Sequence, residues 1–230
     1  MTRFPLWLTL GSIFLAAQAL AAIPGFQQDF AAGVGGFGGG STTTHVTSGG
    51  VGGAADPYLS ISNAIASQLG TFSADGNLVG DLPADGVTGY SFWLRDTGAN
   101  DNHQIHVAVG QAGVNVWLSI PGFTPPDGSW QQFSVDTTNA SQWVRIIGTG
   151  TFAAARANSN RLLFRHDLAP FVMLPDTAAG DFGLDRIQVL PPPNVPALSA
   201  AGLAALALGL VALAGFALYR RAASAPPALR

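Results

Sequence analysis

Short runs of alternating apolar and polar residues, separated by Gly, Pro, Asp and Asn, are the feature that most constrains the fold of this chain. Alternation with a period of two places successive side chains on opposite faces of a strand. No amphipathic helical pattern lies between these runs. The expected strands are residues 26–30, 43–47, 58–62, 89–95, 103–109, 114–120, 130–135, 143–147, 161–165 and 182–190. We therefore expect an all-β antiparallel sandwich of two sheets over residues 23–190.

Residues 31–53 are so rich in Gly that they offer few side chains to bury. This segment is expected to be a loop region, interrupted only by the polar strand at 43–47. A phosphate-binding loop is excluded, because no Lys-Ser or Lys-Thr pair follows the glycines and no helical pattern begins there.

The clearest predicted hairpin joins residues 103–109 to 114–120 through the turn at 110–113. In that register Val109 faces Val114 and Val107 faces Val116. The apolar side chains then share the core face, and they are Ile105, Val107, Val109, Val114, Val116, Leu118 and Ile120. The opposite face places His106 beside Trp117.

An aromatic and polar patch is expected on the outside of this sheet. The strand at 89–95 turns Tyr90, Phe92 and Leu94 inward, which leaves Trp93 and Arg95 on its outer face. An outward Trp offers a flat ring for stacking on a sugar, and polar neighbours can bind hydroxyl groups. The candidate ligand-binding residues are Trp93, Arg95, Gln104, His106, Asn115 and Trp117. Burial of both tryptophans beneath a loop is the alternative.

Charge and missing residue types exclude several classes of function. Between the two apolar ends lie six arginines and thirteen aspartates, a formal charge of −7, which argues against a nucleic-acid partner. Cys is absent, so disulfides, thiol nucleophiles and zinc-thiolate sites are excluded. Glu is absent as well, and neither a G-x-S-x-G nor an H-E-x-x-H motif occurs. We expect a protein that is not an enzyme.

Both ends of the chain carry membrane-related signals. A positive residue at Arg3, an apolar stretch at 6–20 and small residues around Ala22 predict a signal peptide over residues 1–22. A second apolar run of roughly 20 residues, 200–219, is long enough to cross a bilayer. Arg220 and Arg221 begin a short basic tail at 220–230, which places the sandwich outside the cytoplasm.

The C-terminal segment resembles the PEP-CTERM and IPTL-CTERM sorting signals of bacterial envelope proteins. A Pro-rich stalk at 191–199 contains the short motif, which the apolar span and the arginine pair then follow. The resemblance rests on Val195, Pro196, Ala197, Leu198, Ser199, Arg220 and Arg221. It implies recognition and cleavage by an exosortase-like membrane enzyme. A plain C-terminal anchor on a stiff stalk is the alternative.

The central domain resembles jelly-roll modules of the laminin B and carbohydrate-binding kind. The resemblance lies in residues 56–62, 89–94, 128–136 and 183–189, and it implies a jelly-roll-like sandwich. Carbohydrate-binding jelly rolls often hold a structural calcium between the first and last strands, which implies Asp29 and Asp185 as ligands here. Turn formation and solvation are the alternative roles of these two carboxylates.

These observations predict an exported bacterial envelope protein whose sandwich binds extracellular polysaccharide or matrix. A purely structural surface or biofilm-matrix protein is the closest alternative, and an unrecognised hydrolase is the third.

Overall fold

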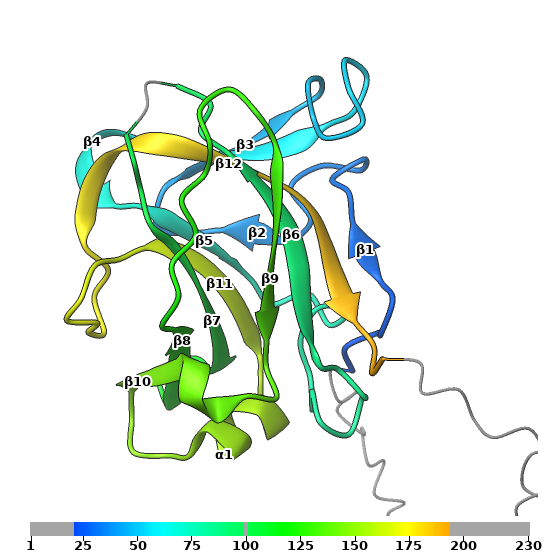
Figure 1. The fold of residues 1–230 in the computed structure, drawn as a ribbon, viewed down its shortest axis with the longest axis vertical. Helices are drawn as coiled ribbons and strands as arrows, with labels where there is room; N and C mark the ends of the chain where they lie inside the picture. Colours follow the sequence, from blue (N-terminus) through cyan, green and yellow to red (C-terminus); the bar gives the residue numbers. More distant parts are fainter. Residues whose placement is uncertain (1–20, 99–100, 194–230) are drawn as a thin grey trace, which may run out of the picture. The chain divides into compact units, whose positions relative to one another are not determined.

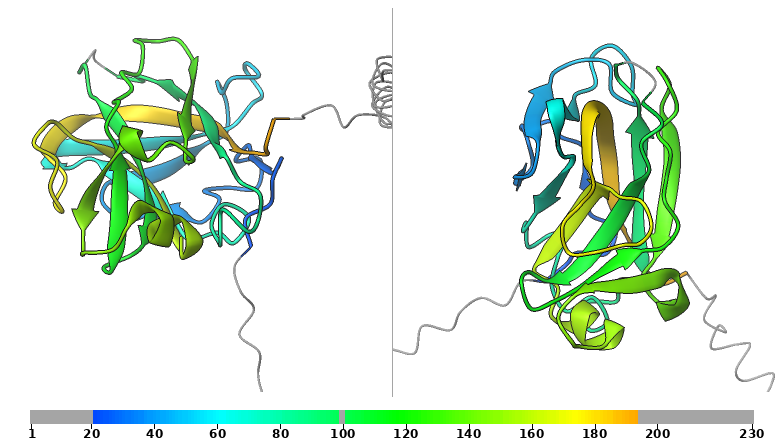
Figure 2. Two further views of the ribbon diagram at one scale, coloured as in Figure 1. Left: turned by 60° about the horizontal axis from the view of Figure 1, so that its bottom comes forward. Right: turned by 90° about the vertical axis from the view of Figure 1, so that its left-hand side faces the viewer.

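The computed structural model describes residues 21–98 and 101–193, which form two packed antiparallel sheets (Figure 1). The predicted all-β sandwich is therefore confirmed. Two further views show the sheets lying face to face, with the short helix at one end of the domain (Figure 2). The described chain begins and ends at neighbouring points, because the amide of Gly25 donates to the carbonyl of Val189 at 2.8 Å.

Sheet A has the strand order β3-β4-β12-β6-β9, and β1 pairs with β12. Its long central strand β12 is held by β4 along its first half and by β6 along its second half. The strands of sheet A are β1 (Gln27–Gln28), β3 (Thr42–Val46), β4 (Tyr58–Gln68), β6 (Gly89–Arg95), β9 (Gln131–Asp136) and β12 (Thr177–Leu190).

Sheet B has the strand order β10-β8-β7-β11-β5-β2. Strand β7 is central and pairs with both β8 and β11. The strands of sheet B are β2 (Phe37–Gly38), β5 (Gly70–Ser73), β7 (Ile105–Gln111), β8 (Asn115–Ser119), β10 (Trp143–Ile147) and β11 (Arg161–His166).

Alternating residues of both sheets fill the space between them. From sheet A the core receives Tyr90, Phe92 and Leu94 of β6, as their spacing predicts, and each is fully buried. From sheet B, Phe164 packs edge-on against Phe92, with ring centroids 5.0 Å apart. Phe37 of the Gly-rich segment is also in this core. Residues 31–53 thus contain a second short strand, β2, in addition to the predicted polar strand, which the structure places at β3.

A short helix, α1 (Phe152–Ala157), closes one end of the sandwich and was not expected from the sequence. Thr151 caps its N-terminus by accepting a hydrogen bond from the amide of Ala154. Phe152 is buried and stacks on Trp143, with ring centroids 5.1 Å apart. The 3-10 turn η1 (Ala140–Gln142) leads into β10.

The predicted register of the β7–β8 hairpin is wrong. Val109 faces Trp117 instead of Val114, a shift of three residues, because β7 runs on to Gln111 and the turn is formed by residues 112–114. Gly113 takes the left-handed conformation that this turn requires, at φ +72°. An odd shift reverses the two faces of β8 relative to β7.

The reversal changes the environment of the β8 residues. Val116 and Leu118 leave the expected core and join Ala108 in a second apolar cluster on the outer side of sheet B. Trp117 turns toward the main core instead. Val114 lies in the turn and Ile120 follows the end of β8, and both side chains are exposed.

The predicted signal peptide is, apart from Ala21 and Ala22, outside the described residues, as are the sorting motif and the apolar span at 200–219. Within residues 21–98 and 101–193, no helix has the length and apolarity needed to cross a membrane.

Candidate functional site

The outer face of sheet A carries an open hollow of about 450 Å³. The register of β12, β6 and β9 forms its floor, because Ser91 lies between Gln188 and Ser134. The hollow is lined by Ser91, Gln132, Phe133, Ser134, Gln188 and Leu190. None of these side chains is charged, so the hollow suits a neutral polar ligand better than an ion.

The polar groups of this hollow are not used by the fold. Within the part of the chain that the structure describes, no protein group forms a hydrogen bond with the side chains of Ser91, Gln132, Ser134 or Gln188. Gln132 and Ser134 are exposed, whereas Gln188 is half-buried and Ser91 is buried. Two amides and two hydroxyls therefore offer both donors and acceptors at one surface.

Trp93 adds an aromatic side chain to the same face. It follows Ser91 by two residues on β6 and pairs directly with Gln132 of β9. The side chain is half-buried. We call Ser91, Trp93, Gln132, Ser134 and Gln188 the polar face. An indole beside free amides and hydroxyls is an arrangement that can stack on a sugar ring and bind its hydroxyl groups.

Arg95 lies at the rim of the polar face, where it packs a loop onto sheet A. Its guanidinium carbon is 4.9 Å from the ring centroid of Tyr58 and 4.8 Å from that of Trp130. Arg95 and the indole nitrogen of Trp130 both donate to the carbonyl of Gly49, at 3.2 and 3.0 Å. Arg95 is thus committed to holding residues 47–57 in place.

Asp185 of β12 binds the backbone of the same loop. It is fully buried, and its two carboxylate oxygens accept hydrogen bonds from the amides of Val51 and Arg186, at 2.8 and 2.7 Å. Burial raises the pKa of Asp185 to about 6, although both hydrogen bonds act in the opposite direction. Arg186 also pairs with Asp56 of the loop at 3.3 Å.

The predicted calcium ligands make separate contacts. Asp29 is exposed and accepts a hydrogen bond from the amide of Ala31, as in a simple turn. Asp185 has its own backbone partners. Among the described residues, no group of three or more potential ligands is placed to hold a metal. Calcium binding by Asp29 and Asp185, with backbone carbonyls as further ligands, therefore stays a prediction.

The predicted six-residue patch is not formed, because its members lie on two sheets. Trp93 and Arg95 are on β6 of sheet A, whereas His106, Asn115 and Trp117 are on β7 and β8 of sheet B. Gln104 is exposed just before β7.

His106 and Trp117, expected side by side, point to opposite faces of sheet B. The His106 ring lies on the outer side, 4.9 Å from the ring of Phe171, and burial lowers its pKa. Trp117 packs near Phe152 with ring centroids 5.5 Å apart, and its indole nitrogen donates to Asn115 at 3.0 Å. Both Trp117 and Asn115 therefore contribute to packing at the α1 end.

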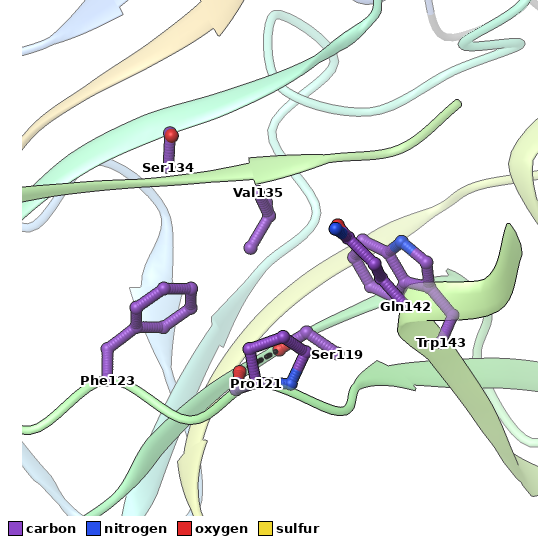
Figure 3. Close-up of a pocket in the computed structure, with 7 residues that line it drawn as sticks. All are labelled: Ser119, Pro121, Phe123, Ser134, Val135, Gln142 and Trp143. Atoms are coloured by element: carbon purple, nitrogen blue, oxygen red, sulfur yellow. Dashed lines mark hydrogen bonds between the residues drawn. The ribbon is translucent and has the colours of Figure 1, made fainter. Parts of the chain in front are cut away.

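A smaller hollow of about 140 Å³ opens between the edges of the two sheets (Figure 3). Val135 of β9 points into it from sheet A, while Pro121 and Trp143 bound it on the side of sheet B. Its lining mixes apolar residues with Ser119, Ser134 and Gln142, and contains no acidic, basic or histidine side chain. It therefore offers no acid, base or paired nucleophile for catalysis.

The residues that sequence reasoning missed are Ser91, Gln132, Ser134 and Gln188. Alternation along 130–135 indicates that Gln132 and Ser134 share one face. No local sequence pattern indicates that β9 lies beside β6, because β7 and β8 intervene in the sequence and belong to the other sheet.

No protein-family model matches the chain, and no curated protein matches it by sequence. Among solved structures, the domain is similar to a family 11 carbohydrate-binding module from Clostridium thermocellum, determined in complex with a β-1,3-1,4-mixed-linked tetrasaccharide. The two are 19% identical over 74% of this chain and 98% of that one, with a TM-score of 0.47.

Two further solved structures show a similar degree of likeness to the chain. The CBM22-2 xylan-binding domain of Paenibacillus barcinonensis Xyn10C is 15% identical over 72% of this chain and 98% of that chain, with a TM-score of 0.45. The K1 cleaved adhesin domain of Lys-gingipain from Porphyromonas gingivalis is 14% identical over 72% of this chain and 97% of that chain, with a TM-score of 0.45. The chain is thus distantly similar in structure to β-sandwiches of carbohydrate-binding modules.

Proposed function

We propose that the domain binds a neutral polysaccharide through the polar face of sheet A. The observation that carries the proposal is the open hollow whose amides and hydroxyls have no internal partner and lie beside Trp93. A sugar ring presents an apolar face for the indole and hydroxyl groups for Gln132, Ser134 and Gln188. A shallow, open hollow of this kind gives weak binding to an extended chain and does not enclose a small molecule.

We further propose that this domain acts outside the cytoplasm, in the bacterial envelope. The signal peptide at 1–22, the span at 200–219 and the Arg220-Arg221 pair support export and retention. The motif at 195–199 supports processing by an exosortase-like enzyme. The intact mass of the mature chain from envelope fractions tests this: loss of the residues after the motif supports processing, whereas an intact Arg230 supports a plain anchor.

Retention on insoluble cellulose, chitin and xylan tests the binding proposal. The full-length chain, reconstituted in phosphatidylcholine nanodiscs, is compared with empty nanodiscs. We expect retention on at least one of the three polymers, and Trp93→Ala to weaken it by roughly tenfold, since aromatic stacking contributes about 0.5–1.5 kcal/mol beyond the area it buries.

Two adjacent glutamines provide the matched control. Gln132 lies in the hollow and pairs with Trp93, whereas Gln131 is exposed, pairs with Leu94 and is not part of the hollow. We expect Gln132→Ala to reduce retention and Gln131→Ala to leave it unchanged. Equal retention of wild type, Trp93→Ala and Gln132→Ala by a polymer, with melting temperatures unchanged, would show that the polar face is not the binding site. No retention on any of the three polymers would favour the structural surface protein.

A further inference from the structure

One arginine of this acidic domain, Arg161, has no hydrogen-bond or ion-pair partner among the described residues. The arginine side chains at 95, 145, 156, 165 and 186 each donate a hydrogen bond within the domain. Among the residues that the structure describes, Arg161 forms neither an ion pair nor a side-chain hydrogen bond, and its Nε atom is buried without an acceptor. Its guanidinium carbon lies 3.9 Å from the ring centroid of Phe72. The Phe72 ring thus stabilises the charge through a cation–π contact, whereas the hydrogen-bond donors of Arg161 are not used within the described residues.

Arg161 lies in a groove on the outer face of sheet B. One hollow, of about 160 Å³, has Val116, Ile146, Ile147 and Leu163 among its lining residues, together with Arg161. A second, of about 140 Å³, is lined by Phe72 and by Gly70 of β5 among others. Leu163, Arg165 and Pro175 line both hollows, which are therefore adjacent. We call the two together the apolar groove.

The connection between β11 and β12, residues 167–176, forms one wall of the apolar groove, and we call it the strap. Met173 and Pro175 contribute to the groove lining. Buried Arg165 ties the strap to sheet B by donating to the carbonyls of Val172 and Met173 and to the carboxylate of Asp167. Figure 1 shows this connection, in yellow, on the side of the domain away from the two ends of the described chain.

The outer surface of the strap is apolar as well. Leu168, Val172, Met173 and Leu174 are between 47% and 58% exposed. Four exposed large apolar side chains within seven residues form a patch of the kind that marks an interaction site. The groove thus combines an apolar floor, the exposed Met173 of the strap and one guanidinium that forms no hydrogen bond within the described residues.

We propose that the apolar groove is a second binding site, for a linear apolar chain that ends in a carboxylate. The chain lies over Val116, Ile147 and Leu163, and the carboxylate accepts hydrogen bonds from Arg161. This charge complementarity selects an anionic amphiphile, because a neutral sugar would leave the apolar floor without a matching surface and Arg161 without a counter-charge. The site is on the opposite sheet from the polar face, so either site can fail without the other.

Equilibrium binding of decanoate to the full-length chain in phosphatidylcholine nanodiscs tests the proposal. Empty nanodiscs correct for partition into lipid, and 1-decanol serves as the neutral analogue. We expect one saturable decanoate site per chain, and binding of 1-decanol at least about tenfold weaker, since a charge-assisted hydrogen bond contributes about 1.5–3 kcal/mol.

Substitutions at two arginines locate the carboxylate. Arg161→Gln is expected to weaken decanoate binding at least about tenfold, and Arg161→Lys to weaken it less because the charge remains. Arg145→Gln removes one positive charge from an exposed position outside the groove lining and is expected to leave the affinity unchanged. Thermal melting of each variant verifies that it is folded.

Two results would overturn the proposal. The first is the absence of saturable decanoate binding above that of empty nanodiscs. The second is saturable binding that Arg161→Gln and Arg145→Gln affect equally, which would show a response to net charge alone.

Discussion

The two outer faces of this sandwich use the same strand geometry for opposite chemistry. On sheet A, Ser91, Gln132 and Ser134 lie on the outer face, and within the described residues their side chains form no hydrogen bond. On sheet B, Leu118 and Ala108 occupy comparable outward positions and are fully buried, because Phe171 of the strap and neighbouring apolar side chains pack over them. Function is therefore expected to depend on which face a residue occupies more than on which strand it belongs to.

The arginines of the two sheets also differ in how deeply they are buried. Arg95 on sheet A is half-exposed and stacks between two aromatic rings. Arg165 on sheet B and its partner Asp167 are each 1% exposed. A buried ion pair is stable only while both partners are present, so damage to the two faces should have unequal consequences.

The largest expected difference in stability is between substitutions of these two arginines. Arg165→Met leaves the buried carboxylate of Asp167 without its partner and releases the strap carbonyls, so it should lower the free energy of unfolding by about 3–5 kcal/mol. Arg95→Met removes one hydrogen bond and two cation–π contacts at a half-exposed site, and about 1 kcal/mol is expected. Urea denaturation of both variants measures the difference. Equal losses would mean that the strap does not depend on its buried ion pair.

A second, smaller difference in stability is expected between substitutions of apolar residues on the outer face of sheet B and of polar residues on the outer face of sheet A. Leu118→Ala should cost about 2–4 kcal/mol, as in a true core, because Leu118 is fully buried beneath its outer-face neighbours. Ser134→Ala on sheet A should change stability by no more than about 0.5 kcal/mol. If Leu118→Ala were as mild as Ser134→Ala in thermal or urea unfolding, the outer face of sheet B would be open rather than covered.

The two faces should also respond to pH with opposite sign. The folded pKa of Asp185 is raised from 3.8 to about 6, so between these values the folded state binds more protons than the unfolded state. Stability then falls as pH rises through this window, by about 1–3 kcal/mol. The pKa of His106 is lowered by burial, so its contribution is present above pH 6.5 and is lost as pH falls below it.

Unfolding experiments from pH 4 to pH 8 separate these two contributions. Asp185→Asn should remove the loss of stability with rising pH. His106→Gln should reduce the loss with falling pH but not remove it, because burial also lowers the pKa of His166. An unchanged pH profile in either variant would show that the group does not titrate differently in the folded and unfolded states.

Alternation predicted much of the architecture. The expected strands at 89–95, 143–147 and 161–165 correspond closely to β6, β10 and β11, and the inward assignment of Tyr90, Phe92 and Leu94 is confirmed. These successes rest on the period of two, which is a local property. The two-residue strand β2 was missed because Phe37 is a single apolar residue among glycines.

The pairing between strands was harder to predict from the sequence. Both Gly110 and Gly113 are credible turn residues, yet Gly110 lies in β7 opposite Val116 and only Gly113 is in the turn. This single ambiguity reversed β8 and joined Trp117 to a patch that does not exist. Trp93 was correctly placed on an outer face, but its neighbours come from β9 and β12, which are distant in sequence.

The most direct test of two chemically distinct faces is a crossed binding measurement on two variants of the full-length chain. Retention on insoluble polysaccharide and binding of decanoate are measured for Trp93→Ala and for Arg161→Gln under the same conditions. We predict that Trp93→Ala loses polysaccharide retention and keeps decanoate binding, and that Arg161→Gln shows the reverse. Parallel loss of both activities in either folded variant would contradict the assignment of separate ligands to the two faces.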